Sequence, residues 1–235
     1  MISASLFADS RQTVATQKLT MSAVDVIVFV TLLACTLHGY TLSQRLIESA
    51  KVDFLQERVL AVDQAWHTFV RQYDAIPGDF AYASVHIDSD LTNGDGNGRI
   101  DTDVERGQAW AHLVSAGLLP AIQTDGLPTS DNPSACPLTR CPSNSRGQAM
   151  LLSYGTYGPH FTHESNQLLL GANIPARTLW GLDQRLDDGA LSTGKIQVNQ
   201  AAENFSDAQM NQCLDKRVIT KRLQNVRCAG VVELE

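Results

Sequence analysis

A loop rich in oxygen-bearing side chains offers the clearest chemistry in this chain, because carboxylate, amide and carbonyl oxygens are the ligands that calcium prefers. Polar residues occupy alternate positions from 93 to 97, and a glycine suited to a sharp turn follows at Gly98. This spacing is typical of a calcium loop of the EF-hand kind. The expected ligands are Asn93, Asp95, Asn97, the carbonyl of Arg99, and Asp101.

The end of this loop departs from the calcium pattern. A bidentate acid would fall at Val104, whereas the nearest acid, Glu105, comes one residue later. Asp88 and Asp90 are further acids that could complete the ligand shell if the backbone folds back. Asn, Asp and Gly are also the residues that a plain turn favours. Possible calcium binding and a plain turn therefore both stay open as interpretations.

A second group of polar residues, His160, His163 and Glu164, has only a superficial likeness to a metal site. Metalloproteases place two histidines four apart on one helix, whereas these follow Gly158-Pro159 and are expected in a loop. The chain has no nucleophile elbow, phosphate-binding loop or dinucleotide fingerprint. We therefore expect no catalysis, and a hydrolase using these three residues is a minor alternative.

Three other polar residues are expected to be structural. Asp187 and Asp188 could bind a cation or cap a turn, and we favour the cap because Gly189 follows them. His112 is expected to be a partly exposed residue of a helix.

Five cysteines divide into one single residue and two local pairs. Cys35 lies in an apolar segment, Cys136 and Cys141 lie in a loop rich in Pro, Ser and Asn, and Cys213 and Cys228 lie near the C-terminus. Neither pair has the C-x₂-C spacing or a nearby histidine, which argues against zinc. Two disulfides, Cys136–Cys141 and Cys213–Cys228, are the favoured interpretation and fit an oxidising compartment.

A long helix is the element around which the rest is organised. From Met21 to about Tyr73 the chain has no proline, and Val26–Ser43 carries no fixed charge. From Phe54 onward, apolar residues recur at helical spacing among charged ones. We expect a helix that lies in lipid, or among other apolar helices, over its first third. The remainder is expected to pack on a globular domain, and Pro77-Gly78 to end the helix.

Shorter elements follow the long helix. The pattern predicts a second helix over 103–119, short strands over 150–157 and 167–172, a short helix after 174, and a strand over 195–198.

The net charge of −7, with only 18 Lys and Arg, argues against a nucleic-acid partner. Arg11 and Lys18 against Asp9 place residues 1–20 on the cytoplasmic side and the C-terminal domain outside.

Several stretches resemble the type IV pilins and the pseudopilins of type II secretion. They are the segment 20–27 with Gln44–Ile47, the sequence Y-D-A-I-P-G-D-F at 73–80, the G-D-G-N-G at 94–98, Glu105–Leu118 and Pro175–Ile196. In that family a dedicated peptidase removes a short leader, and an acid near the new N-terminus pairs with the amine of a neighbouring subunit. The resemblance makes Met21 the mature N-terminus and Asp25 the acid. The family has glycine at the place of Thr20, so cleavage is expected to be slow, and glutamate at the place of Asp25.

The resemblance implies an α+β, pilin-like fold: a long N-terminal α-helix, transmembrane in its first part, packed on a small antiparallel β-sheet domain with extra short helices. The expected organisation is a leader at 1–20, a membrane and filament-core helix at 21–52, and a globular domain at 53–235. The implied function is that of a structural subunit of a pilus or pseudopilus. Its partners would be other subunits, the inner membrane and the prepilin peptidase, with the C-terminal domain in the periplasm or outside the cell.

A membrane-anchored lipoprotein with a periplasmic binding domain is the alternative. Leu32-Leu33-Ala34-Cys35 approximates the sequence at which lipoproteins are acylated on cysteine. Against this alternative, Asp25 precedes the apolar run and the helical pattern continues through Cys35.

Overall fold

The structure is a computed structural model in which residues 22–120, 141–200, 206–215 and 226–234 are described. The expected leader, with Thr20 and Met21, and Cys136 lie outside the described residues. The chain divides into two compact units, Met1–Arg45 and Leu46–Glu235.

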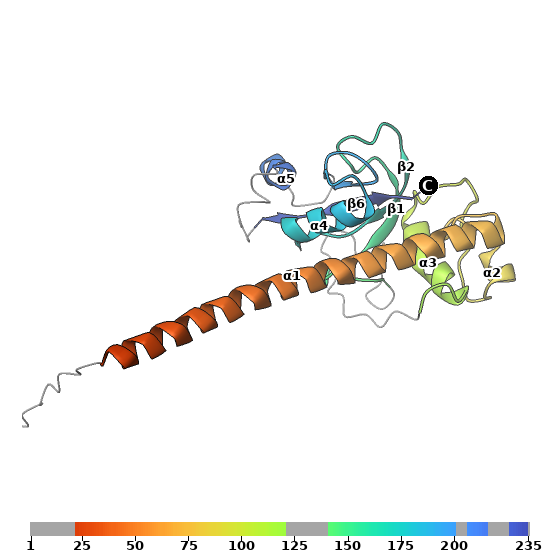
Figure 1. Cartoon of the computed structure of the whole chain (residues 1–235). Helices are drawn as coiled ribbons and strands as arrows, with labels where there is room; N and C mark the ends of the chain where they lie inside the picture. Colours follow the sequence, from red (N-terminus) through yellow and green to blue (C-terminus); the bar gives the residue numbers. More distant parts are fainter. Residues whose placement is uncertain (1–21, 121–140, 201–205, 216–225, 235) are drawn as a thin grey trace, which may run out of the picture. The chain divides into compact units, whose positions relative to one another are not determined.

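Helix α1, Ala23–Tyr73, contains 51 residues and belongs to both units (Figure 1). In the first unit every described residue from 22 to 43 is exposed, including Phe29 and Leu32. The hydroxyl groups of Thr31, Thr36, Thr41 and Ser43 donate to carbonyls of the preceding turn, as Thr31 does to Val28 at 2.8 Å, so these four groups are bonded without water. Within the described part of the chain, α1 is the one helix long and apolar enough to cross a membrane.

In the second unit, α1 buries one face in a hydrophobic core, as the spacing of its apolar residues predicts. Leu55, Val59, Val62, Trp66 and Phe69 are each at most 3% exposed. Glu57 and Gln64, which lie between them, are exposed, so α1 is amphipathic here and packs on a small antiparallel sheet.

The long helix ends at Tyr73, as expected, a few residues before the stop signal Pro77-Gly78. Asp74 adopts a positive φ of 49°, which turns the chain out of the helix, and its N–H still bonds to the Val70 carbonyl at 2.9 Å. Pro77 and Gly78 then form the turn that redirects the chain, with φ of 95° at Gly78.

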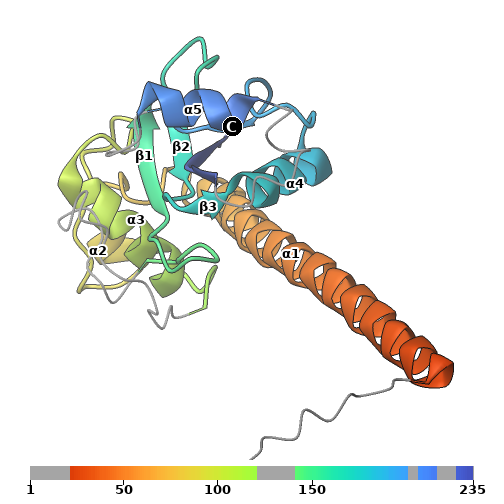
Figure 2. The ribbon, with the colours of Figure 1, turned by 90° about the vertical axis from the view of Figure 1, so that its left-hand side faces the viewer.

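The main sheet has four antiparallel strands in the order β1-β2-β6-β4. Figure 2 shows β1 and β2 side by side. A second sheet pairs β3 with β5. The strands are β1 Leu151–Gly155, β2 Ser165–Leu169, β3 Ile174–Pro175, β4 Ile196–Val198, β5 Arg227–Cys228 and β6 Gly230–Glu233. The strands expected from the sequence correspond to β1, β2 and β4.

Short helices complete the second unit: α2 Ala83–His86, α3 Asp103–Ser115, α4 Ala176–Leu186 and α5 Asp207–Leu214. Helix α4 packs closely against α1. A Cβ added at Gly181 of α4 would lie 2.9 Å from the Val52 side chain of α1. In the same contact Arg185 donates to the Asp53 carboxylate and, at 2.9 Å, to Gln56. The described architecture is a mixed helix and antiparallel sheet fold with a long N-terminal helix, in agreement with the expected α+β class.

Candidate functional site

The turn after α1 places one buried carboxylate, that of Asp79, against the loop G-D-G-N-G. Its Oδ1 accepts the N–H groups of Gly96 at 2.7 Å and Asn97 at 3.2 Å, and its Oδ2 accepts that of Gly98 at 2.6 Å. Asp79 is only 3% exposed. The loop therefore closes around a single side chain supplied by the turn at the end of α1.

Glycine is required where this loop meets Asp79. A Cβ on Gly94 would lie 2.3 Å from the Asp79 Cα, so no larger residue fits. Gly96 and Gly98 have φ of 76° and 83°, which other residues rarely adopt. The glycine spacing thus serves the approach of the loop to Asp79, whether or not a cation is bound.

A second buried carboxylate, that of Glu105, comes from the first turn of α3. Its Oε2 accepts the N–H of Thr102 at 3.0 Å and of Asp101 at 3.1 Å, while the Thr102 hydroxyl accepts the N–H of Glu105. This is a capping box, which fixes the glutamate at the start of the helix. The Oε1 atom also accepts the N–H of Asp95 at 3.4 Å.

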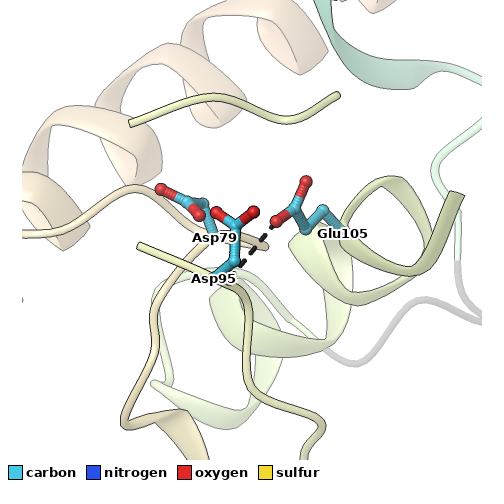
Figure 3. Close-up of side chains that lie close together, drawn as sticks. All are labelled: Asp79, Asp95 and Glu105. Atoms are coloured by element: carbon cyan, nitrogen blue, oxygen red, sulfur yellow. Dashed lines mark hydrogen bonds between the residues drawn. The ribbon is translucent and has the colours of Figure 1, made fainter. Parts of the chain in front are cut away.

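Asp79, Asp95 and Glu105 form an acidic group whose ligand oxygens lie within 4.8 Å of one another (Figure 3). Asp79 and Glu105 are buried and Asp95 is exposed. Burial raises the pKa of Asp79, the three loop amides lower it, and the hydrogen bond with Asp95 raises it. Chemically, such a group can hold a divalent cation or share a proton between neighbouring carboxylates.

Of the two acids expected as calcium ligands, Asp95 belongs to this group and Asp101 does not. The Asn93 amide oxygen accepts the Ser84 N–H at 2.9 Å, and Asn97 donates to Asp95 at 3.1 Å. The Arg99 guanidinium lies 4.8 Å from the centre of the Tyr154 ring. Among the acids, the structure therefore brings Asp95 together with Asp79 and Glu105 instead of with Asp101.

Asp79 is the residue of this group that the loop pattern missed, because it precedes the loop by more than a dozen residues. The sequence does mark Asp79 in another way, because it is the aspartate of the P-G-D-F segment that ends the long helix. Glu105 is the acid nearest to the expected place of the bidentate ligand, and the T-x-x-E spacing from Thr102 is a sequence signature of its capping role.

A second acidic group comprises Asp183, Asp187 and Asp188. Asp187 accepts the N–H of Ile196 at 2.7 Å, and Asp188 accepts that of Ala190 at 2.8 Å. The bond to Asp188 confirms its expected turn-capping role, whereas Asp187 bonds to the first residue of β4, nine positions away.

His112 is fully buried, so the expectation that it is partly exposed was wrong. The ring lies between the turn at Gly78 and the loop at Thr92 and bonds to the backbone of both. The helical pattern identified its helix but could not show that two loops cover this face.

Asp25, the residue expected to act in assembly, lies in the first turn of α1. Its Oδ2 accepts the N–H of Ser22 at 3.0 Å, and the Ser22 hydroxyl accepts the N–H of Val24 at 3.2 Å. Asp25 therefore also caps its own helix, a role that the S-x-x-D spacing indicates and that sequence reasoning missed.

Cys213 and Cys228 form a disulfide that joins α5 to β5, as expected. Cys141 is also disulfide-bonded, and its expected partner Cys136 lies outside the described residues. Cys35 is exposed and unbonded on α1.

His160, His163 and Glu164 do not form a three-ligand metal group among the described residues. The His163 ring lies 3.6 Å from the Glu233 carboxylate, and the His160 backbone donates to Gln197 at 3.0 Å. Glu164 is exposed.

Comparison of this chain with protein-family models, with proteins of assigned function and with solved structures gives no match.

Proposed function

We propose that the chain is a structural subunit of a pilin-like filament, either a type IV pilus or the pseudopilus of a type II secretion system. The exposed apolar part of α1, up to residue 43, would anchor the chain in the inner membrane before assembly and lie in the filament core afterwards. Its second unit would be displayed on the periplasmic or outer side. The prepilin peptidase would act between Thr20 and Met21.

The observation that carries this proposal is the complete exposure of an apolar helix segment. Every described residue from 22 to 43 is exposed, and no Asp, Glu, Lys or Arg occurs between Asp25 and Arg45. A helix of this length spans about 30 Å, the thickness of a bilayer core. An apolar surface of this size needs lipid or other apolar helices around it, and a filament subunit meets both in turn.

The sheet edges support association through the helix instead of through strand pairing. At the β4 edge, Ile196 and Val198 donate their N–H groups to Asp187 and to Leu191. At the β1 edge, Tyr154 donates to the Ile100 carbonyl at 2.7 Å. Edge amides that are already bonded offer little to a further strand.

Asp25 gives the proposal its sharpest test, because its charge and its capping role can be separated. Asp25→Asn keeps an oxygen that can accept the Ser22 N–H but removes the charge that would meet the Met21 amine of a neighbouring subunit. This substitution should therefore leave the second unit folded and reduce incorporation into filaments. The measurement is the amount of chain in sheared or detergent-extracted filaments, relative to the amount in the membrane.

Ser22→Ala is the matched control, since it removes the hydroxyl that caps Val24 while the Asp25 charge stays. It should assemble nearly as the natural chain does. Normal assembly of Asp25→Asn, or an equal loss in both variants, would show that the charge has no role in assembly.

A further inference from the structure

His112 of α3 joins two loops that are far apart in sequence. Its Nδ1 atom lies 2.9 Å from the backbone nitrogen of Gly78, and its Nε2 atom lies 3.0 Å from the carbonyl oxygen of Thr92. On the α1 side, the ring is stacked on Phe69, with the ring centres 6.2 Å apart. The imidazole is fully buried, so its two nitrogens rely on these backbone partners.

These partners fix the protonation state of the ring. The Gly78 N–H can only donate, so Nδ1 must carry a lone pair. The Thr92 carbonyl can only accept, so Nε2 must carry the hydrogen. The ring is therefore the neutral Nε2–H tautomer. A proton added at Nδ1 would face the Gly78 N–H across 2.9 Å and replace an attraction with a repulsion.

The turn at Gly78 has little room to relieve that repulsion. A Cβ placed on Gly78 would lie 2.6 Å from the Glu105 carbonyl oxygen and 3.1 Å from the Ala109 Cβ, so the turn already lies directly against α3. The next residue, Asp79, holds the N–H groups of Gly96 and Gly98. Movement of the turn away from His112 would therefore be transmitted to the loop bound to Asp79.

We propose that His112 is an acid-sensitive clasp: in its neutral form it joins the turn that ends α1 to the loop at Thr92, and a proton on Nδ1 opens this joint and loosens loop 92–98. The sheet, which His112 does not contact through hydrogen bonds, stays folded when the clasp opens.

The electrostatic surroundings favour the neutral ring. Burial lowers the pKa of His112, and the bond to the Thr92 carbonyl offsets this only in part. The elements around the ring carry several titratable or charged groups: Asp63, His67, Arg71 and Tyr73 of α1, Asp74 and Asp79 of the turn, His86 of α2, Asp88, Asp90 and Asp95 of the loop, and Asp103, Glu105 and Arg106 of α3. The carboxylates of Asp79 and Glu105 are engaged by backbone N–H groups of the loop and of the α3 cap.

The sign of the pH dependence follows from this direction. When the clasp is open, the ring has its ordinary pKa near 6.5 and takes up a proton more readily than when it is closed. Opening is therefore promoted as the pH falls below about 6.5. The opening equilibrium rises up to about tenfold per pH unit until the pKa of the closed form is reached.

Hydrogen exchange of the full chain in detergent micelles tests the clasp. Peptides covering residues 76–98 are compared with peptides covering 165–170 between pH 7.5 and 5.0, after correction for the intrinsic exchange rate. We expect acid to reduce protection in 76–98 while 165–170 keeps its protection. His112→Asn, whose amide oxygen can accept the Gly78 N–H and does not titrate, should remove this acid response. His67→Asn is the control, because His67 is partly exposed on α1 and should leave the response unchanged.

An acid response that persists in His112→Asn, or its absence in the natural chain, overturns the proposal. If His112→Asn does not fold, nitrogen NMR of the natural chain replaces it. The ring should then be the Nε2–H tautomer at pH 7.5, and the Gly78 amide signal should shift together with ring protonation. Protonation of the ring without any change at Gly78 would likewise overturn the clasp.

Discussion

Asp79 organises the loop that follows the long helix, because one carboxylate accepts three backbone N–H groups. Asp79→Ala removes the buried carboxylate to which these three N–H groups bond. We predict a loss of about 2–4 kcal/mol in the free energy of unfolding, since hydrogen bonds to charged groups are among the stronger ones. Thermal unfolding of the full chain in detergent, followed by tryptophan fluorescence, measures this change.

Asp101→Ala is the control for that substitution, because the Asp101 side chain is exposed and outside the acidic group. It should change stability by less than about 0.5 kcal/mol. Equal effects of the two substitutions would mean that the amide contacts to Asp79 contribute little.

The prediction that the loop binds calcium can also be tested by changing a single residue. A weak site with a dissociation constant of roughly 10⁻⁴–10⁻³ M would gain about 1–2 kcal/mol of stability from 5 mM calcium by mass action. Asp95→Ala removes the exposed carboxylate of the group and should abolish the increase in melting temperature. An equal increase with magnesium, or none with calcium, would identify the loop as a plain turn closed by Asp79.

At the scale of elements, the Cys213–Cys228 disulfide holds α5 against β5 and closes a loop with a sequence separation of 15. Such a loop contributes about 3 kcal/mol in the chain-entropy model. Cys213→Ser with Cys228→Ser should therefore lower the melting temperature by roughly 6–12 °C. Cys35→Ser is the control and should leave it unchanged, because Cys35 is exposed and unbonded.

The elements that the sequence predicted well are those with local signals. The apolar spacing along α1, the apolar residues on one face of α3 and the stop at Asp188-Gly189 act through neighbours within a few residues. Strand β6 was not predicted, although it lies at the centre of the sheet between β2 and β4. Its four residues carry too short a pattern, and their place depends on two strands far away in the chain.

The same distinction explains the candidate site. The loop at 93–101 was visible because its residues are contiguous, whereas Asp79 and His112 reach it from other elements. Their contribution depends on the turn that follows α1 and on how α3 packs. No periodicity within either segment encodes that arrangement.

At the scale of the whole molecule, the proposal assigns anchoring and assembly to one compact unit and display outside the membrane to the other. The unit Met1–Arg45 has an exposed apolar helix segment, and the unit Leu46–Glu235 has a closed core and bonded sheet edges. The first is suited to lipid and to helix–helix contact, and the second to an aqueous compartment in which disulfides persist.

The mass of the N-terminal peptide of the chain recovered from purified filaments tests the central claim most directly. The account predicts that the chain is present in that fraction and begins at Met21, with or without a methyl group on its amine. A chain that is absent from filaments and begins at a lipid-modified Cys35 in the membrane fraction would contradict it.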